Sequence, residues 1–227
     1  MKFRKHYSKT GRFDLASIHV PRYNRPGGFT FEDQAFMGVV GQHPVSSGGV
    51  VATDNFTRAN ASTLGSNYTP CGQGSGPYDG MSISSNTAIG ATGLSTMSAW
   101  TANTFHNDQY SKATYFSAAV GSKYLQVAVR LTGAGATLNG YQITTDSANW
   151  FLSKITAAGT ATNLTTGTSA MTAGDTLEIK AVGTTISAYH NGTLLGSVTD
   201  SSYASGSAGI GGYQTSQASA LEVGNVD

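Results

Sequence analysis

Charged side chains are scarce in this sequence: they make up 11% of its 227 residues, and the formal net charge is +1. So small a net charge argues against a protein whose whole surface grips nucleic acid or an anionic membrane. Helix surfaces are usually filled with Glu, Lys and Arg, so the shortage of these residues disfavours helices. The abundant serine and threonine, together with 29 glycines, favour strands joined by tight turns.

Cysteine is almost absent, and no apolar run is long. The single cysteine, Cys71, excludes an internal disulfide and a metal site built from several thiolates. No stretch reaches the roughly 18 to 20 apolar residues that cross a bilayer. Basic and polar residues interrupt every candidate signal-peptide core up to Arg25, so we expect no signal peptide and no membrane partner.

Positive charge is concentrated at the N-terminus. In residues 1–26 the only acidic residue is Asp14. Neither the helical nor the strand period persists through residues 1–51, which prolines and glycines punctuate, so we predict an extended basic arm and linker there. We expect this arm to anchor the chain to a partner. The predicted anchoring residues are Lys2, Arg4, Lys5, Lys9, Arg12, Arg22, Arg25, Phe29 and Phe31.

The cations of the arm suit either of two partners, because they would neutralise phosphates or lie on an acidic protein lattice equally well. Phe3, Tyr7 and Phe13 are interspersed among them and favour a protein surface with apolar pockets. Nucleic acid is therefore the less favoured partner, and a solvated tail without a partner is the plain alternative.

Residues 52–227 predict an all-β domain, because short alternating segments are separated by Gly, Asn, Asp and Ser. Alternation is clearest in residues 124–131, where leucine and valine occupy the odd positions. These side chains are predicted to face one way, and Arg130 the opposite way, as in a half-buried strand. Further predicted strands are residues 81–84, 97–101, 110–118, 141–145, 150–155, 177–181 and 221–226.

The sharpest local signal is a hairpin. Asn191-Gly192 supplies the positive φ angles that a two-residue type I′ turn requires, between strands at 184–189 and 194–198. With the strand before it, the segment 174–199 predicts a meander of three strands. Each strand would bury one face against a second antiparallel sheet.

Several short motifs follow one another in order from Asp54 to the C-terminus. They are Asp54-Asn55-Phe56-Thr57-Arg58-Ala59, Leu64-Gly65-Ser66-Asn67-Tyr68, Asn107-Asp108-Gln109-Tyr110, Val127-Ala128-Val129-Arg130, Ala173-Gly174-Asp175-Thr176-Leu177, Tyr189-His190-Asn191-Gly192 and Gly206-Ser207-Ala208-Gly209. In this order they resemble the concanavalin A-like, laminin-G-type jelly rolls of bacterial and phage proteins. The resemblance implies a two-sheet antiparallel jelly-roll sandwich. Because such folds carry lectins, adhesion modules, glycosidases and virion proteins alike, function must be argued from a site.

No pattern in the sequence is typical of a catalytic or metal site. A glycosidase needs two carboxylates on one face of a cleft, whereas Asp175 and Glu178 lie three apart, on opposite faces of a strand. The histidines lack the spacing of a zinc site, and a structural role is the better interpretation of His190. We therefore predict a non-enzyme with no catalytic residue, cofactor or metal. A calcium ion held by distant loops remains the open alternative.

Sugar binding usually needs an exposed aromatic ring beside hydrogen-bonding groups. Trp150 and Tyr141 fall within predicted strands and are expected to fill the core. Tyr78, Tyr203 and Tyr213 lie near glycine and serine, so we predict that they are exposed. These three tyrosines are the candidate glycan contacts.

These observations, with the resemblance, favour a non-enzymatic phage virion protein, either a capsid decoration protein or a tail or fibre appendage. The arm, residues 1–51, would anchor it to the major capsid or tail protein, and many copies on one particle would turn weak contacts into firm attachment. We expect it in the virion. The alternative is a lectin-like carbohydrate-binding or adhesion module that recognises host-surface glycans, and an enzyme ranks third.

Overall fold

The computed structural model describes residues 48–72, 79–116, 123–146, 148–156 and 160–226. The predicted anchoring residues from Lys2 to Phe31, and Tyr78, lie outside these ranges, so the anchoring role of the arm stays a prediction. Within them, the one helical element described is a single 3-10 turn, η2 (Gly135–Thr137). None of the described helices is long and apolar enough to span a membrane.

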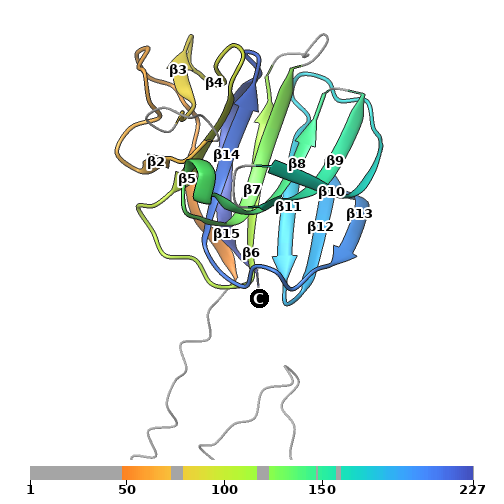
Figure 1. The fold of residues 1–227 in the computed structure, drawn as a ribbon. Coiled ribbons are helices and arrows are strands. Elements are labelled where there is room, and N and C mark those ends of the chain that lie inside the picture. The colour runs from red at the N-terminus through yellow and green to blue at the C-terminus, as the bar shows by residue number, and fades with distance from the viewer. Residues whose placement is uncertain (1–47, 73–78, 117–122, 147, 157–159, 227) are drawn as a thin grey trace, which may run out of the picture. The chain divides into compact units, whose positions relative to one another are not determined.

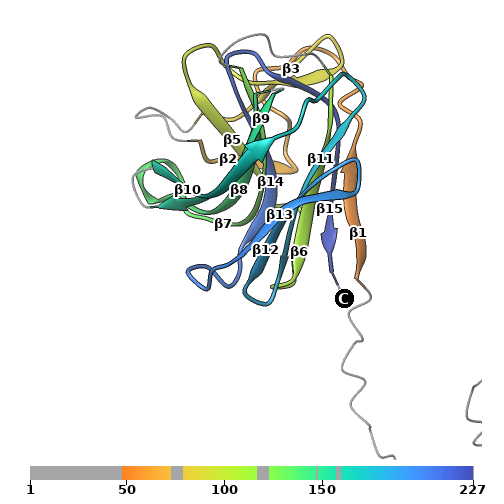
Figure 2. The same ribbon diagram turned by 90° about the vertical axis from the view of Figure 1, so that its right-hand side faces the viewer.

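Two antiparallel sheets form a sandwich, as the sequence predicts (Figures 1 and 2). The eight-stranded sheet runs in the order β13 (Thr193–Thr199), β12 (Thr185–His190), β11 (Thr176–Val182), β6 (Gln109–Tyr115), β15 (Gln217–Asn225), β4 (Thr87–Ile89) and β3 (Ser82–Ser84), with β1 (Gly49–Asp54) also beside β15. The seven-stranded sheet runs in the order β10 (Thr160–Thr168), β9 (Asn149–Thr156), β8 (Asn139–Thr145), β7 (Tyr124–Thr132), β14 (Ser207–Tyr213), β5 (Ser95–Trp100) and β2 (Tyr68–Pro70).

Strand β1 begins slightly before the predicted domain boundary. Gly49 and Val50 pair with Asn225 and Gly224 of β15, so residues 49–51 belong to the eight-stranded sheet. The sequence interpretation placed them at the end of the linker. Their glycine-rich context hid the strand, because pairing with a distant segment leaves no local trace.

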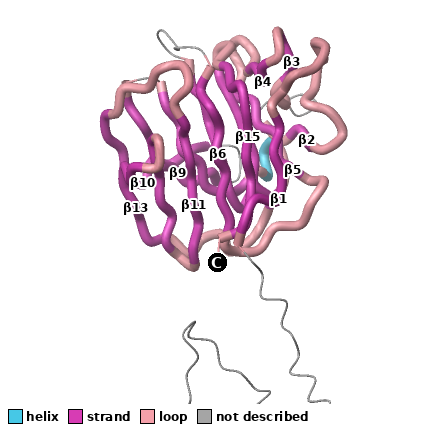
Figure 3. The backbone as a smooth tube through the Cα atoms, turned by 180° about the vertical axis from the view of Figure 1, so that it is seen from behind, coloured by secondary structure: helices cyan, strands magenta, loops and turns pink. Residues whose placement is uncertain are grey.

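The predicted hairpin is confirmed. Asn191 and Gly192 have φ angles of 48° and 76°, and they join β12 to β13. Strands β11, β12 and β13 are neighbours in the sheet, which confirms the meander of three strands. Figure 3 shows β13, β11, β6, β15 and β1 on the same side of the sandwich.

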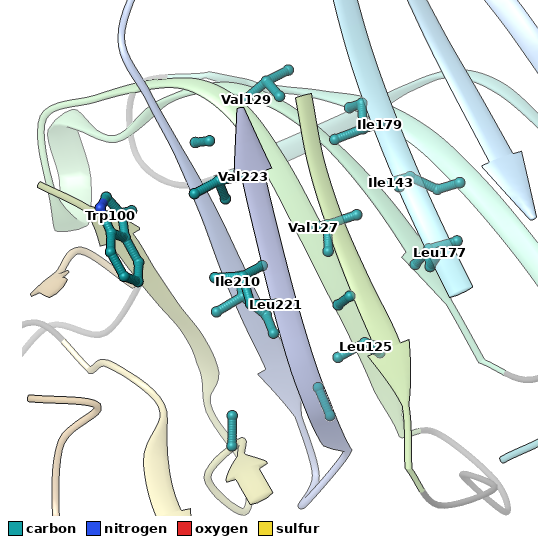
Figure 4. Close-up of a cluster of buried hydrophobic side chains, with 14 of the residues drawn as sticks. Trp100, Leu125, Val127, Val129, Ile143, Leu177, Ile179, Ile210, Leu221 and Val223 are labelled. Atoms are coloured by element: carbon teal, nitrogen blue, oxygen red, sulfur yellow. The ribbon is translucent and has the colours of Figure 1, made fainter. Parts of the chain in front are cut away.

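The main core lies between the sheets. Leu125, Val127 and Val129 of β7 are fully buried and face Leu177 and other apolar residues of the eight-stranded sheet (Figure 4). Burying one such side chain stabilises the fold by about 1.5 to 3 kcal/mol. Because alternate side chains of these strands fill the core, the side chains on the outer face of each sheet are the ones that remain available for binding.

The alternation of β7 breaks at Arg130, where the prediction is wrong. Arg130 has a positive φ of 54°, and the pairing with β8 shifts register between Val129 and Thr132. Such a bulge adds one residue and reverses the faces beyond it. Leu131 therefore packs on the outer side of the sheet with Ala128, and Arg130 is only 2% exposed.

The buried guanidinium of Arg130 ties loops together. It donates hydrogen bonds to the carbonyl oxygens of Asn107 at 2.9 Å, Tyr203 at 3.0 Å and Gly183 at 2.8 Å. The Asp108 carboxylate lies 3.4 Å away. Three separate loops thus depend on one cation, which no sequence alternation would show.

Replacing Arg130 with methionine is expected to lower the free energy of unfolding by about 1 to 3 kcal/mol, because three loop carbonyls lose the donor that they share. Urea unfolding measures the loss. Lys123→Met is the control and should stay within about 0.5 kcal/mol of wild type. Equal, small effects of both substitutions would contradict the role of Arg130.

A second, partly buried network holds the loop after β13. The Asp200 carboxylate accepts hydrogen bonds from Tyr141 Oη at 2.6 Å, Ser202 N at 2.8 Å and Lys154 Nζ at 3.0 Å. Burial alone would raise the pKa of Asp200, but these bonds, the one from Tyr141 first, outweigh it and hold the pKa well below its usual range. Burial and this carboxylate also raise the pKa of Tyr141 to about 12.

Asp200→Asn is expected to lower the free energy of unfolding at pH 7 by about 1 to 3 kcal/mol. Because the folded-state pKa of Asp200 lies below its unfolded value of about 3.9, the advantage of wild type is present above pH 4 and is lost as the pH falls further. Urea unfolding at pH 7 and pH 3 checks this. A difference that is the same at both pH values would contradict the network.

Candidate functional site

The outer face of the eight-stranded sheet carries paired charges. Glu178, Lys112 and Glu222 stand in register on β11, β6 and β15, and Lys112 Nζ lies 2.8 Å from Glu222 Oε1. Lys180 pairs with Glu178 at 3.1 Å, and its ammonium lies 5.0 Å from the ring centroid of Tyr189. Lys112 and Glu222 also line a hollow on this face, where the Lys112 ammonium already donates a hydrogen bond to Glu222 Oε1. The outer face of the eight-stranded sheet therefore carries partly exposed ion pairs whose opposite charges balance.

The outer face of the seven-stranded sheet is divided in two. One half is covered by a small apolar cluster around Ala128 and Leu131, on which the loop carrying η2 lies. Gly135 N at the start of η2 donates a hydrogen bond to the Cys71 carbonyl at 3.2 Å and fixes the loop there. Burial raises the pKa of the Cys71 thiol to about 12, so this cysteine is a packing residue.

The other half of this face is an open groove of about 280 Å³. Its lining comes from six adjacent strands, β5, β14, β7, β8, β9 and β10. The lining residues are Ser95, Tyr124, Gln126, Gln142, Thr144, Phe151, Ser153, Ala161, Asn163 and Tyr213. None of these side chains carries a formal charge at pH 7, in contrast to the opposite outer face.

Aromatic rings form one side of the groove. Tyr213 of β14 stands in register with Tyr124 of β7, and their ring centroids are 5.9 Å apart with the planes tilted by 43°. Phe151 of β9 completes the aromatic lining. Tyr213 was predicted as a glycan contact, whereas Tyr124 and Phe151 were missed because they stand in strands that the sequence reads as half-buried.

Amides and a hydroxyl form the floor. Gln126, Gln142 and Thr144 are 7%, 4% and 8% exposed, and Gln126 stands opposite Thr144 in the pairing of β7 with β8. Gln126 Oε1 and Thr144 Oγ1 are buried without a hydrogen-bond partner in the described part of the chain. Burying a polar atom without a hydrogen-bond partner costs about 1 to 3 kcal/mol of folding free energy. Proteins therefore rarely leave such an atom unpaired unless water or a ligand pairs with it.

A glycine and a third amide shape the groove further. A Cβ at Gly211 would lie 2.8 Å from Gln126 Oε1, so the glycine leaves room for this amide. At the β10 edge, Ser153 Oγ donates a hydrogen bond to Asn163 Oδ1 at 2.8 Å, which orients the Asn163 amide. The groove therefore offers rings on one side and amides on the floor and at one edge.

The other predicted glycan contacts are not brought to the groove. Tyr203 is partly buried against the main core, with its ring 5.4 Å from that of Tyr141 and its hydroxyl 3.2 Å from Asn139 Oδ1. Its glycine- and serine-rich surroundings suggested exposure, but the loop folds onto the core. Tyr78 lies outside the described residues.

A row of serine, histidine and aspartate escaped the sequence analysis. Ser169 Oγ lies 2.7 Å from His190 Nδ1, and Asp175 Oδ2 lies 3.2 Å from His190 Nε2. Asp175 also accepts hydrogen bonds from Asn191 Nδ2 at 2.7 Å and Thr172 N at 2.7 Å, and these bonds hold its pKa well below the usual range. The carboxylate is thus engaged in closing the turns around β11. The structural role of His190 stays a prediction.

No group of three or more His, Cys, Asp or Glu residues that could hold a metal ion occurs in the described ranges. The groove lining in particular contains only amide, hydroxyl, aromatic and methyl groups. Its chemistry is that of hydrogen bonding and ring packing.

Gln126 is expected to be dispensable for stability. Gln126→Leu removes an amide oxygen that has no partner, so the free energy of unfolding should change by less than about 1 kcal/mol or rise. Gln109→Leu is the matched control, because the buried Gln109 accepts from Arg130 N and donates to His106 O and Gly206 O. The Gln109→Leu substitution should lower the free energy of unfolding by about 1 to 3 kcal/mol or more. Equal losses in thermal unfolding would contradict the unpaired state of Gln126.

Comparison with families of known sequence gives no matching family model, and no curated protein sequence matches. Solved structures do match. The chain is similar to the carbohydrate-binding module CBM66 from Bacillus subtilis, at a TM-score of 0.52 and 15% identity over 72% of this chain and 96% of that one.

Two further matches cover all of the other chain and 79% of this one. One is a Bacillus subtilis protein of unknown function with a galectin-like fold, at a TM-score of 0.51 and 9% identity. The other comes from work titled for endo-acting O-glycanases of human gut microbiota members, at a TM-score of 0.54 and 8% identity. At such identities the likeness establishes the fold alone. The described part of the chain is a concanavalin A-like jelly roll.

Proposed function

We propose that this domain binds carbohydrate, without cleaving it, in the groove on the outer face of the seven-stranded sheet. The observation that carries the proposal is the pairing of an aromatic side, Tyr124 and Tyr213, with a floor of buried polar atoms that have no partner, Gln126 Oε1 and Thr144 Oγ1. Sugars present apolar C–H faces and hydroxyl groups side by side. The groove matches both.

Tyr124 and Tyr213 are only partly buried, so their rings are available for packing against the C–H face of a sugar. Because Gln126 Oε1 and Thr144 Oγ1 are buried in the unbound structure, their side chains must turn toward the groove on binding. Gln126 Oε1 then accepts a hydrogen bond from a sugar hydroxyl, and Thr144 Oγ1 donates or accepts one. In return the cost of leaving these atoms unpaired is relieved on binding. Specific pockets of this kind combine apolar walls with a few placed polar groups.

Binding without hydrolysis follows from the same lining. Cleavage of a glycosidic bond generally needs two carboxyl groups across the sugar, one as acid and one as base or nucleophile. The groove lining contains no Asp or Glu. The similarity to a structure titled for O-glycanases is therefore a similarity of fold, and the residues of this groove favour recognition over catalysis.

Similarity to a structure titled as a carbohydrate-binding module and to a galectin-like fold supports this proposal more than the virion role that the sequence favours. Nothing in the described ranges bears on a virion, a capsid or a tail. That role, the localisation in a virion and the anchoring by residues 1–51 stay predictions from sequence. Multiple copies on one particle would be compatible with a weak sugar site, because avidity multiplies modest affinities.

Tyr213→Ala is expected to weaken binding to glycans on an array, and in titration with the best array ligand, by about tenfold, or roughly 1.4 kcal/mol. The loss arises because the ring that packs against the sugar is removed. Thermal unfolding within a few degrees of wild type would show that the variant is folded.

Tyr189→Ala is the matched control, since Tyr189 is also a partly buried strand tyrosine but stands in the eight-stranded sheet, beside Lys180. It should bind like wild type. Binding that survives Tyr213→Ala and is lost with Tyr189→Ala would move the site to the other face and refute the proposal.

A further inference from the structure

We infer that the groove selects uncharged saccharides and discriminates against acidic ones, such as those that carry uronic or sialic acid. The inference rests on the proposed function and names the class of ligand for the same site. Three features of the described residues support it: the charge of the lining, the kind of polar atom left unpaired, and the engagement of four cations away from the groove.

The lining offers nothing to neutralise an anion. Its polar groups are three amides, three aliphatic hydroxyls and two phenols. Gln126, Gln142 and Thr144 at the floor are nearly buried, so a ligand group that reaches them loses most of its water. A carboxylate that is desolvated without a cation pays a larger cost than a hydroxyl does, because burying an unpaired charge is unfavourable.

The unpaired amide atom of the floor is an acceptor. Gln126 Oε1 has no hydrogen-bond donor in the described structure, and it therefore calls for a ligand donor. A neutral sugar hydroxyl supplies one. An ionised carboxylate or sulfate only accepts, so it would place its oxygens against another oxygen. The position of Gln126 Oε1 thus favours a sugar hydroxyl over an oxyanion, whereas the amide N–H and hydroxyl groups of the lining could donate to either.

Four cations of the described chain are engaged away from the groove. Lys112 and Lys180 pair with glutamates on the opposite outer face, Lys154 pairs with Asp200, and Arg130 is buried among loop carbonyls. Lys123 precedes Tyr124 in the chain but is not part of the groove lining. The lining also contains no carboxylate, the charged ligand that calcium sites commonly use.

The test uses the full chain and pairs of oligosaccharides in which one member carries a neutral sugar where the other carries an acidic sugar. Each oligosaccharide is titrated at 50 mM and 500 mM NaCl. We expect each neutral member to bind at least tenfold more tightly than its acidic counterpart. Its affinity should change less than twofold with salt, because no charge pairs form. An acidic member that binds as tightly as the neutral one at both salt concentrations would overturn the inference.

Asn163→Lys provides the second arm, since Asn163 is exposed at the β10 edge of the groove. Adding a cation there should bring the affinity for the acidic member closer to that for the neutral one at 50 mM NaCl, and 500 mM NaCl should reverse the gain. Asn163→Gln is the matched control and should keep the wild-type selectivity. An acidic affinity that does not rise in Asn163→Lys, with unfolding like wild type, would count against the inference.

The two proposals fail in different ways. Binding to acidic glycans that is abolished by Tyr213→Ala would leave the carbohydrate-binding function standing and refute only the selectivity. Failure of the folded chain to bind any member of either set would refute the carbohydrate-binding function itself.

Discussion

Burial of one face of the central strands is the constraint on which the rest of this molecule depends. Alternate residues of β7, β11 and their neighbours are committed to the space between the sheets, where Leu125, Val127 and Leu177 are completely buried. Side chains available for recognition are therefore those on the two outer faces and in the loops. The two outer faces differ in charge: one carries ion pairs, and the other carries a groove lined by uncharged side chains.

On the eight-stranded sheet, the outer face is covered by cross-strand ion pairs such as Lys112 with Glu222. Exposed pairs of this kind contribute little to stability, but they keep the face hydrated and neutral. On the seven-stranded sheet, the bulge at Arg130 turns Leu131 outward, and the loop with η2 covers that half with a small apolar cluster. The remaining half is a groove whose unpaired floor atoms are a cost that a ligand would offset.

The fold was predictable because its signals are local. Alternation in residues 124–129 and the turn residues Asn191-Gly192 report on backbone geometry directly, and both are as expected. The bulge was not predictable, since one inserted residue leaves the composition of β7 unchanged while it reverses the faces of Arg130 and Leu131. In the same way, the start of β1 depends on pairing with β15, which lies at the other end of the chain.

The candidate site was predictable only in part. Tyr213 was found from its glycine-rich surroundings, but the same reasoning selected Tyr203, which packs against Tyr141. Gln126, Gln142 and Asn163 come from three strands, and only the strand order places them together. The sequence does not give the order of strands in a sheet, so it does not show which residues from different strands share one face.

Location of a bound sugar tests the central claim most directly. The measurement is a crystal structure of the full chain with the tightest neutral oligosaccharide found on the array. The account predicts a sugar ring packed on Tyr124 and Tyr213, with a hydroxyl donating to Gln126 Oε1. A sugar held by the loops or on the face that carries Lys112 and Glu222, with the groove empty, would contradict it.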